Sequence, residues 1–458
     1  MNWSVVILAA GVGKRMRSSI PKSLHQVAGK PMLTHVIDAV RKSSDAEVTV
    51  VVRPDQIESP DFRSAVGKGT KLVGQENQLG TADALSAASE LALGSDRVLV
   101  LYADTPLIEP ETVASLIQAS ESAEVAIAFV TADPPPVGGL GRIVRDSNGT
   151  VARIVEEADA DGSTLAITEV NSGWYAFSGE FLRKNLANIQ PAPNGELYLT
   201  DLIEVAIDAD CNIVTVPAKS PIEIIGVNTR EQLALAEAEL QARYRKHWMS
   251  KGVTLVDPAT TYFGPDVEIE MDVVVHPNTH IRGNSVLREG CEVGPNSIVD
   301  SSEIGQSSEF VSSYADHAQV GANCEVGPFS RLRPGAVLSD DVHIGNYAEI
   351  KESNIGSGTK IGHFSYVGDS TIGANVNIGA GTVFVNYDGS KKNHTTVGDD
   401  VFIGSGSMLV APLEIGDGAL TGAGAVVTKN VEPGTTVFGV PARKQAGSGS
   451  SDRTSERS

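Results

Sequence analysis

Residues 342–373 read VHIGNYAEIKESNIGSGTKIGHFSYVGDSTIG, and an aliphatic residue recurs in this stretch about every six positions. Several of these residues are followed directly by glycine, as in Ile361-Gly362. An α-helix repeats every 3.6 residues, so it cannot keep a six-residue period on one face. A coil of three short strands can, because each aliphatic side chain then points into a triangular core. Hexapeptide repeats of this kind indicate a parallel β-helix.

The same register extends over most of the second half of the chain. At about 18 residues per turn, Val275–Val427 would make roughly eight stacked coils. A Gly- and Val-rich β-sandwich is disfavoured, because the period survives over so many units. The positions are Val275, Ile281, Leu287, Val293 and Val299, then Val320, Val326, Leu332, Leu338, Ile344, Ile350, Ile355, Ile361, Val367, Ile372 and Ile378, and finally Val397, Ile403, Leu409 and Ile415.

One interruption of the register stands out. Phe384 and Val397 are 13 residues apart where six are expected. An insert in a solenoid protrudes, and such loops often build the binding face. This one contains Asn386, Tyr387, Lys391, Lys392 and His394.

The first half of the chain has a different pattern. Val5–Ala10, Glu47–Val52 and Val98–Tyr102 are apolar runs typical of strands buried on both faces, and Pro31–Lys42 and Ala82–Leu93 have helical spacing. This alternation predicts an α/β domain with a Rossmann-like, mostly parallel sheet.

A helix is predicted between the two halves. Thr229-Arg-Glu-Gln232 is a capping-box pattern, and an apolar stripe follows until Gly252. We therefore predict an α/β domain over residues 1–228, a linker helix over 229–252, a β-helix domain over 253–444 and a disordered tail over 445–458.

The composition disfavours several classes of function. Acidic residues outnumber basic ones by 57 to 36, a net charge of −21 over 458 residues. This charge disfavours binding to nucleic acid or to anionic membranes. Cys211, Cys291 and Cys324 are far apart and form no Cys-x-x-Cys pair, which favours a reduced compartment. No apolar run reaches the length of a membrane helix, so we expect a cytoplasmic protein.

A glycine-containing turn follows the first predicted strand, in residues 8–16, LAAGVGKRM. Gly11 and Gly13 would let the backbone approach a phosphate closely. The stretch is not a Walker A loop, because Lys14 is followed by Arg15, and it is not G-x-G-x-x-G, because Met16 replaces the third glycine. The turn alone is equally compatible with a purely structural role.

Nearby polar residues strengthen the hypothesis that this turn binds a nucleotide phosphate. Lys22 follows within PKSLH, and a second polar loop spans residues 75–82. Asp104 directly follows a predicted strand, where ligands gather in parallel sheets. A carboxylate beside a phosphate loop is a natural Mg²⁺ ligand, although a lone Asp104 could equally cap a helix.

Together these stretches resemble the sugar-nucleotidyltransferase family. LAAGVGKRM and PKSLH are similar to its signature, and QLGTA and YAD to its nucleotide and metal elements. The signature departs at Lys14, where the family usually has threonine. The resemblance implies that a sugar 1-phosphate attacks the α-phosphorus of a nucleoside triphosphate and releases pyrophosphate. Positioning and charge neutralisation would carry the catalysis.

A second site is predicted within the repeats. Arg331 and Arg333 flank the inward Leu332, so both can point outward. Together with His363 and the insert they favour a phosphate-binding face. The histidines of this half lack metal-ligand spacing, so we expect no zinc site. Other non-aliphatic positions are Lys351, Tyr366 and Asn377.

The two halves together identify a narrower family than either half does alone. The chain, up to about Pro441, resembles the family of bifunctional N-acetylglucosamine-1-phosphate uridylyltransferases/glucosamine-1-phosphate N-acetyltransferases. The runs that carry the resemblance are RLRPGA, IGHFSYVGDS, NIGAGT and VNYDG. It implies UTP, acetyl-CoA, sugar 1-phosphates and Mg²⁺ as ligands, a left-handed β-helix, and a homotrimer whose acetyl sites are shared between chains. The product would be UDP-N-acetylglucosamine, a precursor for the cell wall.

The resemblance also implies site residues for uridylyl transfer. Lys22 would contact phosphate, and Asp104 and Asn228 would hold Mg²⁺. The remaining nucleotide residues would be Leu8, Ala9, Ala10, Gly11, Gln75, Gly80 and Thr81, and the sugar would be recognised by Gly141, Glu156 and Asn171.

For acetyl transfer, the resemblance implies that His363 removes a proton from the sugar amine, with Glu349 orienting the ring. Free imidazole titrates near neutral pH, which suits this task. Asn386 and the Tyr387 amide would face either substrate or the oxyanion. Arg333, Lys351, Tyr366 and Asn377 would bind glucosamine phosphate, and Ala380, Asn386, Tyr387, Lys392, Ser405 and Ala423 would bind acetyl-CoA.

Two alternatives stay open at this point. One is a pyrophosphorylase for another sugar nucleotide, with repeats that serve assembly or regulation. It would not need His363 or the insert. The other is a non-catalytic scaffold, which the presence of Lys22, Asp104 and Asn228 disfavours.

Overall fold

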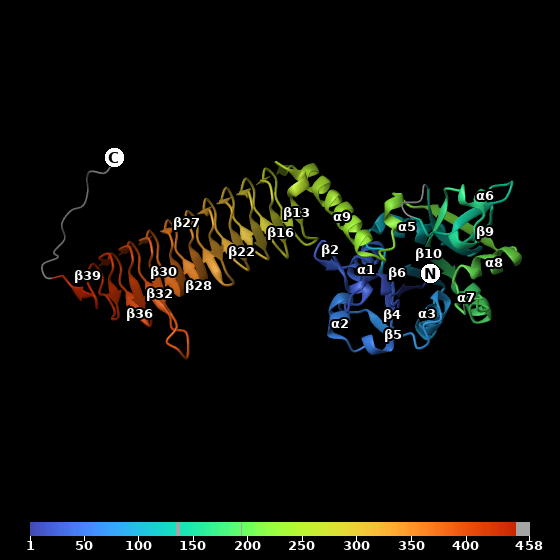
Figure 1. Cartoon of the computed structure of the whole chain (residues 1–458), viewed down its shortest axis with the longest axis horizontal. Coiled ribbons are helices and arrows are strands. Elements are labelled where there is room, and N and C mark those ends of the chain that lie inside the picture. The colour runs from blue at the N-terminus through green and yellow to red at the C-terminus, as the bar shows by residue number, and fades with distance from the viewer. Residues whose placement is uncertain (134–137, 194, 446–458) are drawn as a thin grey trace. The chain divides into compact units, whose positions relative to one another are not determined.

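The computed structural model describes residues 1–133, 138–193 and 195–445 of the chain (Figure 1). The chain divides into two compact units, Met1–Leu240 and a second that begins at Gln241. Of the predicted tail only Gln445 lies within the described residues, and its N–H donates to the Thr436 carbonyl at 2.9 Å.

The first unit is built on a nine-stranded sheet that is mostly parallel, as predicted. The antiparallel pairings all involve β10 (Val170–Ser178) or β8 (Arg142–Arg145). Strand β10 runs antiparallel to β6 (Arg97–Tyr102), β7 (Val125–Ala132) and β8, and β8 runs antiparallel to β9 (Val151–Val155). The order along the sheet is β11 (Asn212–Pro217), β7 (Val125–Ala132), β10 (Val170–Ser178), β6 (Arg97–Tyr102), β1 (Trp3–Leu8), β4 (Glu47–Val52) and β5 (Lys71–Gly74), and β8 (Arg142–Arg145) and β9 (Val151–Val155) extend it beside β10.

Helices cover both faces of this sheet. In β1, Val5 and Ile7 pack with α1, α2 and α5, whereas Val6 and Leu8 pack with α3, α4, α7 and α8. Burial on both faces explains why the strands read as continuous apolar runs. The helices are α1 (Met32–Ser43), α2 (Pro60–Val66), α3 (Thr81–Ala87), α4 (Ser89–Ala92), α5 (Pro110–Ala119), α6 (Gly162–Leu165), α7 (Gly179–Asn185) and α8 (Asp201–Asp208). The helix predicted over Ala82–Leu93 is two helices, because Ala88 leaves helical geometry (φ −91°, ψ 3°).

The predicted joining helix is α9, Arg230–Ser250. Its start carries the expected capping box: Gln232 N–H donates to Thr229 Oγ1 at 3.2 Å, and Gln232 Oε1 accepts from Thr229 N at 3.1 Å. Near its end, Tyr244 and Trp248 pack against the core of the second unit.

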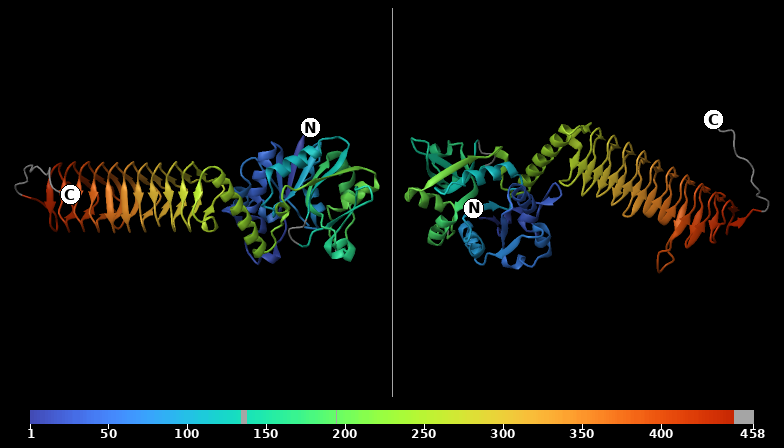
Figure 2. Two further views of the ribbon diagram at one scale, coloured as in Figure 1. Left: turned by 90° about the horizontal axis from the view of Figure 1, so that it is seen from above. Right: turned by 180° about the vertical axis from the view of Figure 1, so that it is seen from behind.

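The second unit is a parallel β-helix, whose coils stack in Figures 1 and 2. From Val275 to Thr421, eight successive parallel pairings join coil to coil. Every aliphatic position named from the six-residue period is buried. Ile304, Phe310 and Ala315 fill the gap in that register between Val299 and Val320.

One sheet of the β-helix contains twelve short strands. They are β12 (Thr254–Leu255), β15 (Val274–Val275), β18 (Glu292–Val293), β21 (Glu309–Phe310), β24 (Glu325–Val326), β27 (His343–Asn346), β29 (Lys360–His363), β31 (Asn377–Ile378), β34 (Phe402–Ile403), β37 (Leu420–Thr421), β39 (Thr436–Phe438) and β40 (Arg443–Lys444).

The remaining strands of the β-helix form a second sheet. Its strands near the candidate site are β16 (His280–Arg282), β19 (Ile298–Asp300), β22 (Tyr314–Asp316), β25 (Arg331–Leu332), β28 (Glu349–Ile355), β30 (Tyr366–Ile372), β32 (Val383–Val385) and β33 (Thr395–Val397). The predicted insert lies between β32 and β33 and projects from the coils as the orange loop in Figure 1.

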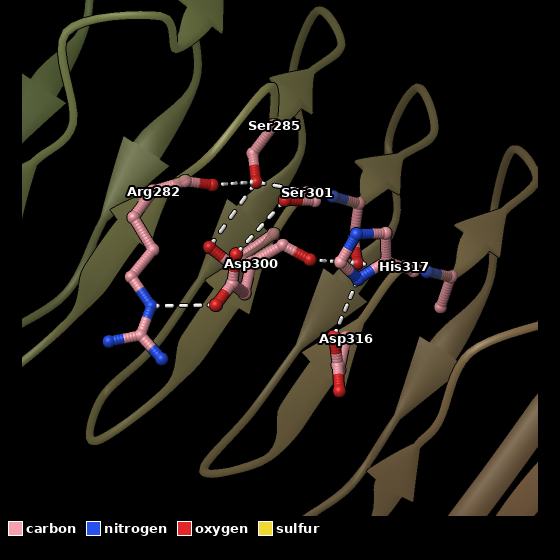
Figure 3. Close-up of polar contacts among 9 residues, drawn as sticks. Arg282, Ser285, Asp300, Ser301, Asp316 and His317 are labelled. Carbon is pink, nitrogen blue, oxygen red and sulfur yellow. Dashed lines mark hydrogen bonds and ion pairs between the residues drawn. The ribbon is translucent and has the colours of Figure 1, made fainter. Parts of the chain in front are cut away.

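Parallel stacking places the outward residues of successive coils in columns. Figure 3 shows the start of one such column: Arg282 Nε donates to Asp300 Oδ2 at 2.8 Å, and Asp316 on the following coil pairs with His317 at 2.7 Å. The register that pairs Ala315 with Leu332, and Leu332 with Ile350, continues this column to Arg333 and Lys351. The fold therefore brings predicted site residues from separate coils to one face.

Two candidate active sites

A cavity of about 350 Å³ opens at the carboxyl ends of β1 and β6 in the first unit. Nine of the sequence-predicted residues line it, namely Leu8, Ala9, Ala10, Gly11, Lys22, Gln75, Gly80, Thr81 and Asp104. Residues not predicted also line it, namely Val12, Ser23, Gln78, Ala84, Tyr102 and Ala103.

Lys22 lies at the centre of the polar contacts in this cavity. Its ammonium donates to Asp104 Oδ2 at 2.5 Å and to Asn228 Oδ1 at 2.9 Å. The loop packs closely here: a Cβ on Gly13, which has φ +65°, would lie 2.7 Å from the Lys22 Cβ. Two oxygens thus converge on a cation, and such a pair can hold a divalent metal ion together with substrate phosphates.

The second polar loop is held by buried Gln75. Its side-chain NH₂ donates to the Gly80 carbonyl at 3.0 Å and to Asp83 Oδ2 at 2.7 Å. Because a carboxylate and a carbonyl only accept, the amide oxygen of Gln75 is left as an acceptor for a ligand. Thr81 Oγ1 accepts from the Leu199 N–H at 2.9 Å, which fixes the start of α3.

Gly141, Glu156 and Asn171 lie together next to the cavity, although they are not among the described residues that line it. The Asn171 N–H donates to the Gly141 carbonyl at 2.9 Å, and a Cβ on Gly141 would lie 3.5 Å from the Glu156 carboxylate. Burial, and then Asp159 and Asp201, raise the pKa of Glu156.

Tyr102 connects this group to the cavity and was missed from the sequence. Its ring closes on Gly173, where a Cβ would lie 2.4 Å away, and its hydroxyl hydrogen-bonds to Thr81. Burial is the main reason that the Tyr102 pKa is raised. The signal in the sequence was its place at the end of a buried strand, which alone does not separate a ligand-facing ring from a core ring.

In the second unit, His363 follows the inward Ile361 at the end of β29 and is exposed. Its Nδ1 pairs with Asn346 Oδ1 at 2.6 Å. Within one chain the ring therefore contacts Asn346 and not Glu349, which instead accepts from Arg333. β27 and β29 pair Asn346 with His363, whereas Glu349 is three residues further along and pairs with Tyr366.

His363 belongs to a column at one corner of the prism. Backbone N–H groups of successive coils donate to the carbonyls of Asn346, His363, Ala380 and Ser405 in turn, at 2.7 to 3.2 Å. This corner column consists of Asn346, His363, Ala380, Ser405 and Ala423. Three residues predicted for acetyl-CoA are therefore in line with the predicted base.

A cationic cluster lies on the second sheet. Arg333 Nη1 donates to Glu349 Oε1 at 2.7 Å, and Lys351 Nζ is 3.7 Å from Asp369 Oδ2. The Lys392 side chain, from the insert, lies beside that of Lys351. This nearby second cationic group is the main reason that the Lys351 pKa is lowered. Facing ammonium groups of this kind favour an anion between them.

The insert that supplies Lys392 is internally braced. Tyr387 and Lys392 form an antiparallel bridge, and the Asn393 N–H donates to the Asn386 carbonyl at 2.7 Å. The Asp388 carboxylate accepts from four backbone and side-chain donors, and its backbone bond to Lys391 is the leading cause of its strongly lowered pKa.

Asn377 is placed apart from the cationic cluster. It lies on β31, between Lys360 and Phe402 of the twelve-stranded sheet. Lys351 and Tyr366 belong to the other sheet, and Arg333 directly follows its strand β25. Within one chain the structure therefore brings together only three of the four residues predicted for glucosamine phosphate.

An exposed aromatic ladder beside His363 was not predicted. Tyr347 stacks between Phe329 and Phe364, with ring centroids 5.4 and 5.7 Å apart, and each ring is more than half exposed. All three residues have positive φ. They occupy the position after the corner residue on successive coils, a recurrence that the period of inward residues does not reveal.

Comparisons with known proteins agree with this division. Residues 5–243 match the MobA-like NTP transferase domain, and residues 352–386 and 394–429 match the bacterial transferase hexapeptide repeats. The chain is similar over almost its full length to proteins named bifunctional protein GlmU. It is 42% identical to that of Clostridium novyi (strain NT) over 95% of both chains. It is 43% identical to that of Thermotoga sp. (strain RQ2), over 93% of this chain and 94% of the relative. It is 40% identical to that of Corynebacterium jeikeium (strain K411), over 95% and 90%.

Proposed function

The chain belongs to the family of the bifunctional protein GlmU, and from that membership we propose how its two units divide two transfer reactions. The chain is a glucosamine-1-phosphate N-acetyltransferase and an N-acetylglucosamine-1-phosphate uridylyltransferase, and its end product is UDP-N-acetylglucosamine. The main support for assigning one reaction to each unit is that each unit has its own group of interacting polar side chains. One group surrounds Lys22, and the other comprises His363 and the cationic cluster.

Uridylyl transfer belongs to the cavity of the first unit. Gln75 presents an acceptor oxygen, which suits the N–H edge of uracil, and Gly80 and Thr81 lie beside it. The glycine turn Gly11–Gly13 and Lys22 face the triphosphate. Glu156 and Asn171 contact the sugar hydroxyls, so that the sugar phosphate oxygen attacks the α-phosphorus and pyrophosphate leaves.

Asp104 and Asn228 would hold Mg²⁺, because their oxygens already converge on the Lys22 ammonium. Bound Mg²⁺ would supply neutralisation of the charge that develops on the triphosphate. Lys22 would then turn from Asp104 to phosphate. Among the described residues that line the cavity, Asp104 is the one carboxylate, and it contacts this cation.

Acetyl transfer belongs to the corner column and the cationic cluster. With Asn346 accepting from Nδ1–H, the Nε2 of His363 is the free base. It removes a proton as the sugar amine attacks the thioester carbonyl. The new C–N bond forms, the C–S bond breaks, and coenzyme A leaves as a thiolate that takes up a proton. The Tyr387 N–H faces the oxyanion, and Ala380, Ser405 and Ala423 line the path of the acetyl donor.

Arg333 and Lys351 bind the phosphate of glucosamine 1-phosphate, with Tyr366 beside them. We also propose that the chain is a homotrimer. The separation of Asn377 from the cationic cluster supports this, because a neighbouring copy would supply Asn377 to the site. The exposed ladder of Phe329, Tyr347 and Phe364 supports it as well, because such a surface favours burial. Light scattering should give about three times the 48.0 kDa of one chain.

One assay tests the two reactions together. Purified chain is given glucosamine 1-phosphate, acetyl-CoA, UTP and Mg²⁺, while free thiol and pyrophosphate are followed separately. We expect thiol release without UTP, and pyrophosphate release only when acetylated sugar is formed or supplied. Pyrophosphate release with no thiol release would instead support the single-reaction pyrophosphorylase.

A further inference from the structure

Asp369 contacts two members of the acetyl-transfer site without having been predicted for it. It lies on β30, and its side chain is 19% exposed. Its Oδ2 accepts from the side-chain NH₂ of Asn386 at 2.5 Å and lies 3.7 Å from Lys351 Nζ. A carboxylate thus lies between the insert and the phosphate-binding lysine.

This carboxylate decides how the Asn386 amide is turned. A carboxylate only accepts hydrogen bonds, so the NH₂ group of Asn386 must face it. The same NH₂ is 3.3 Å from the Tyr366 hydroxyl oxygen. Both contacts hold the nitrogen, so the amide oxygen is left to accept from a ligand. Of the two roles expected for Asn386, this orientation fits contact with a substrate N–H and not with an oxyanion.

The absence of a side chain at Gly368, next to Asp369, makes room for the contact between Asp369 and Asn386. A Cβ on neighbouring Gly368 would lie 2.5 Å from the Tyr366 hydroxyl and 2.7 Å from the Asn386 nitrogen. Gly368 also pairs in register with Lys351. Only a residue without a side chain lets these groups meet over the strand.

Asp369 also balances charge in the cationic cluster. Lys351 faces Lys392, whose ammonium repels it, and Glu352 and Asp369 supply the nearby negative charge. Without Asp369, two ammonium groups would face each other with less compensation, and Lys351 would be displaced from the phosphate position.

We propose that Asp369 is a positioning residue for acetyl transfer, which orients Asn386 as an acceptor and holds Lys351 in the phosphate site. The inference rests on the proposed function of the second unit. Asp369 does not touch the reacting atoms and acts through Asn386 and Lys351.

The test is Asp369→Asn in the full-length chain, with Asp400→Asn as the matched control. Both aspartates have positive φ, +51° and +55°, a conformation that asparagine adopts readily. Asp400 lies at another corner and is exposed. We expect Asp369→Asn to lower kcat/KM for glucosamine 1-phosphate by about tenfold or more, as for loss of a charged hydrogen bond. KM for acetyl-CoA and the melting temperature should equal those of the control.

A double-mutant cycle with Asn386→Ala separates positioning from packing. If Asp369 acts mainly through Asn386, adding Asp369→Asn to Asn386→Ala should cost much less than it costs the wild-type chain. Fully multiplicative losses would overturn the positioning of Asn386. A melting temperature lowered relative to Asp400→Asn, or unchanged kcat/KM, would overturn the whole inference. A wild-type chain that releases no thiol would instead overturn the proposed function, and the inference with it.

Discussion

The ammonium of Lys22 lies 2.5 Å from the carboxylate of Asp104, and the two residues are 82 positions apart in the chain. Both side chains are largely buried. Asn228 completes the contact at 2.9 Å. A divalent cation held by Asp104 and Asn228, as proposed, would compete with the Lys22 ammonium for these oxygens, and a triphosphate would give Lys22 a new partner. The proposed site would thereby couple metal binding to nucleotide binding.

Lys22→Gln therefore has opposite effects on metal affinity and on catalysis. Without nucleotide, we expect Mn²⁺ to bind about tenfold more tightly, because a competing positive charge is gone. Uridylyl transfer should fall by about tenfold or more, because the phosphate loses a charged contact. Calorimetric titration with Mn²⁺ alone measures the first effect, and pyrophosphate release the second. Equal Mn²⁺ affinity in the two proteins would contradict the coupling.

The division of labour between the units predicts a crossed pattern. His363→Ala should lower acetyl transfer by about 100-fold or more, because the general base is lost, and leave uridylyl transfer in place. Asp104→Ala should lower uridylyl transfer by a similar factor and leave acetyl transfer in place. Thiol and pyrophosphate release from each variant are the measurements. Loss of both reactions from either folded variant would refute the division.

The sequence predicts the inside of the β-helix better than its outside. A period of six decides which side chains point inward, and every position that it marked is buried. Contacts between outward residues depend instead on the length of each coil. His363 meets Asn346, 17 residues before it, and Arg333 meets Glu349, 16 residues after it. Because coil lengths vary, the period alone could not separate Asn346 from Glu349 as the partner of His363.

In the first unit, the motifs located residues that line the cavity but missed Tyr102. The motifs reveal glycines and charges beside strand ends, and these line the cavity as expected. A tyrosine at the end of an apolar strand is predicted to be a core residue and not a ligand-facing one. Its placement beside Gly173 follows from the antiparallel pairing of β10 with β6, which the alternation of strands and helices did not indicate.

Asn346→Ala tests the hydrogen bond that the structure assigns to the His363 ring. Losing the acceptor at Nδ1 lets the ring rotate and change tautomer, so we expect kcat for acetyl transfer to fall by about tenfold. KM for glucosamine 1-phosphate should change little, because Arg333 and Lys351 remain. Glu349→Gln is the informative comparison, since it contacts Arg333 and should raise that KM instead. The reverse pattern would restore Glu349 as the orienting residue.

Arg333→Ala should weaken binding of glucosamine 1-phosphate by about 10- to 100-fold, the usual effect of losing a charged hydrogen bond. Arg333 is held by Glu349, so its guanidinium is oriented before the ligand arrives. Calorimetry on the full chain measures the dissociation constant directly. Arg331→Ala is a matched control two residues earlier, because that side chain lies over the Tyr314 ring, 5.5 Å from its centroid. Unchanged affinity in Arg333→Ala would remove it from the site.

The facing lysines predict the alkaline limit of phosphate binding. The Lys351 pKa is lowered below 10.5, first by its contact with Lys392 and then by burial, while Asp369 and Glu352 oppose this. An anion is bound by the protonated form, so affinity is full below the lowered pKa and falls as pH rises through it. Lys392→Met removes the leading cause. It should move the alkaline limb of inorganic phosphate binding to higher pH, although affinity near neutral pH falls with the lost charge. Inorganic phosphate is the probe because it lacks the titrating sugar amine. Limbs that coincide in the two proteins would show that Lys392 does not set the protonation of Lys351.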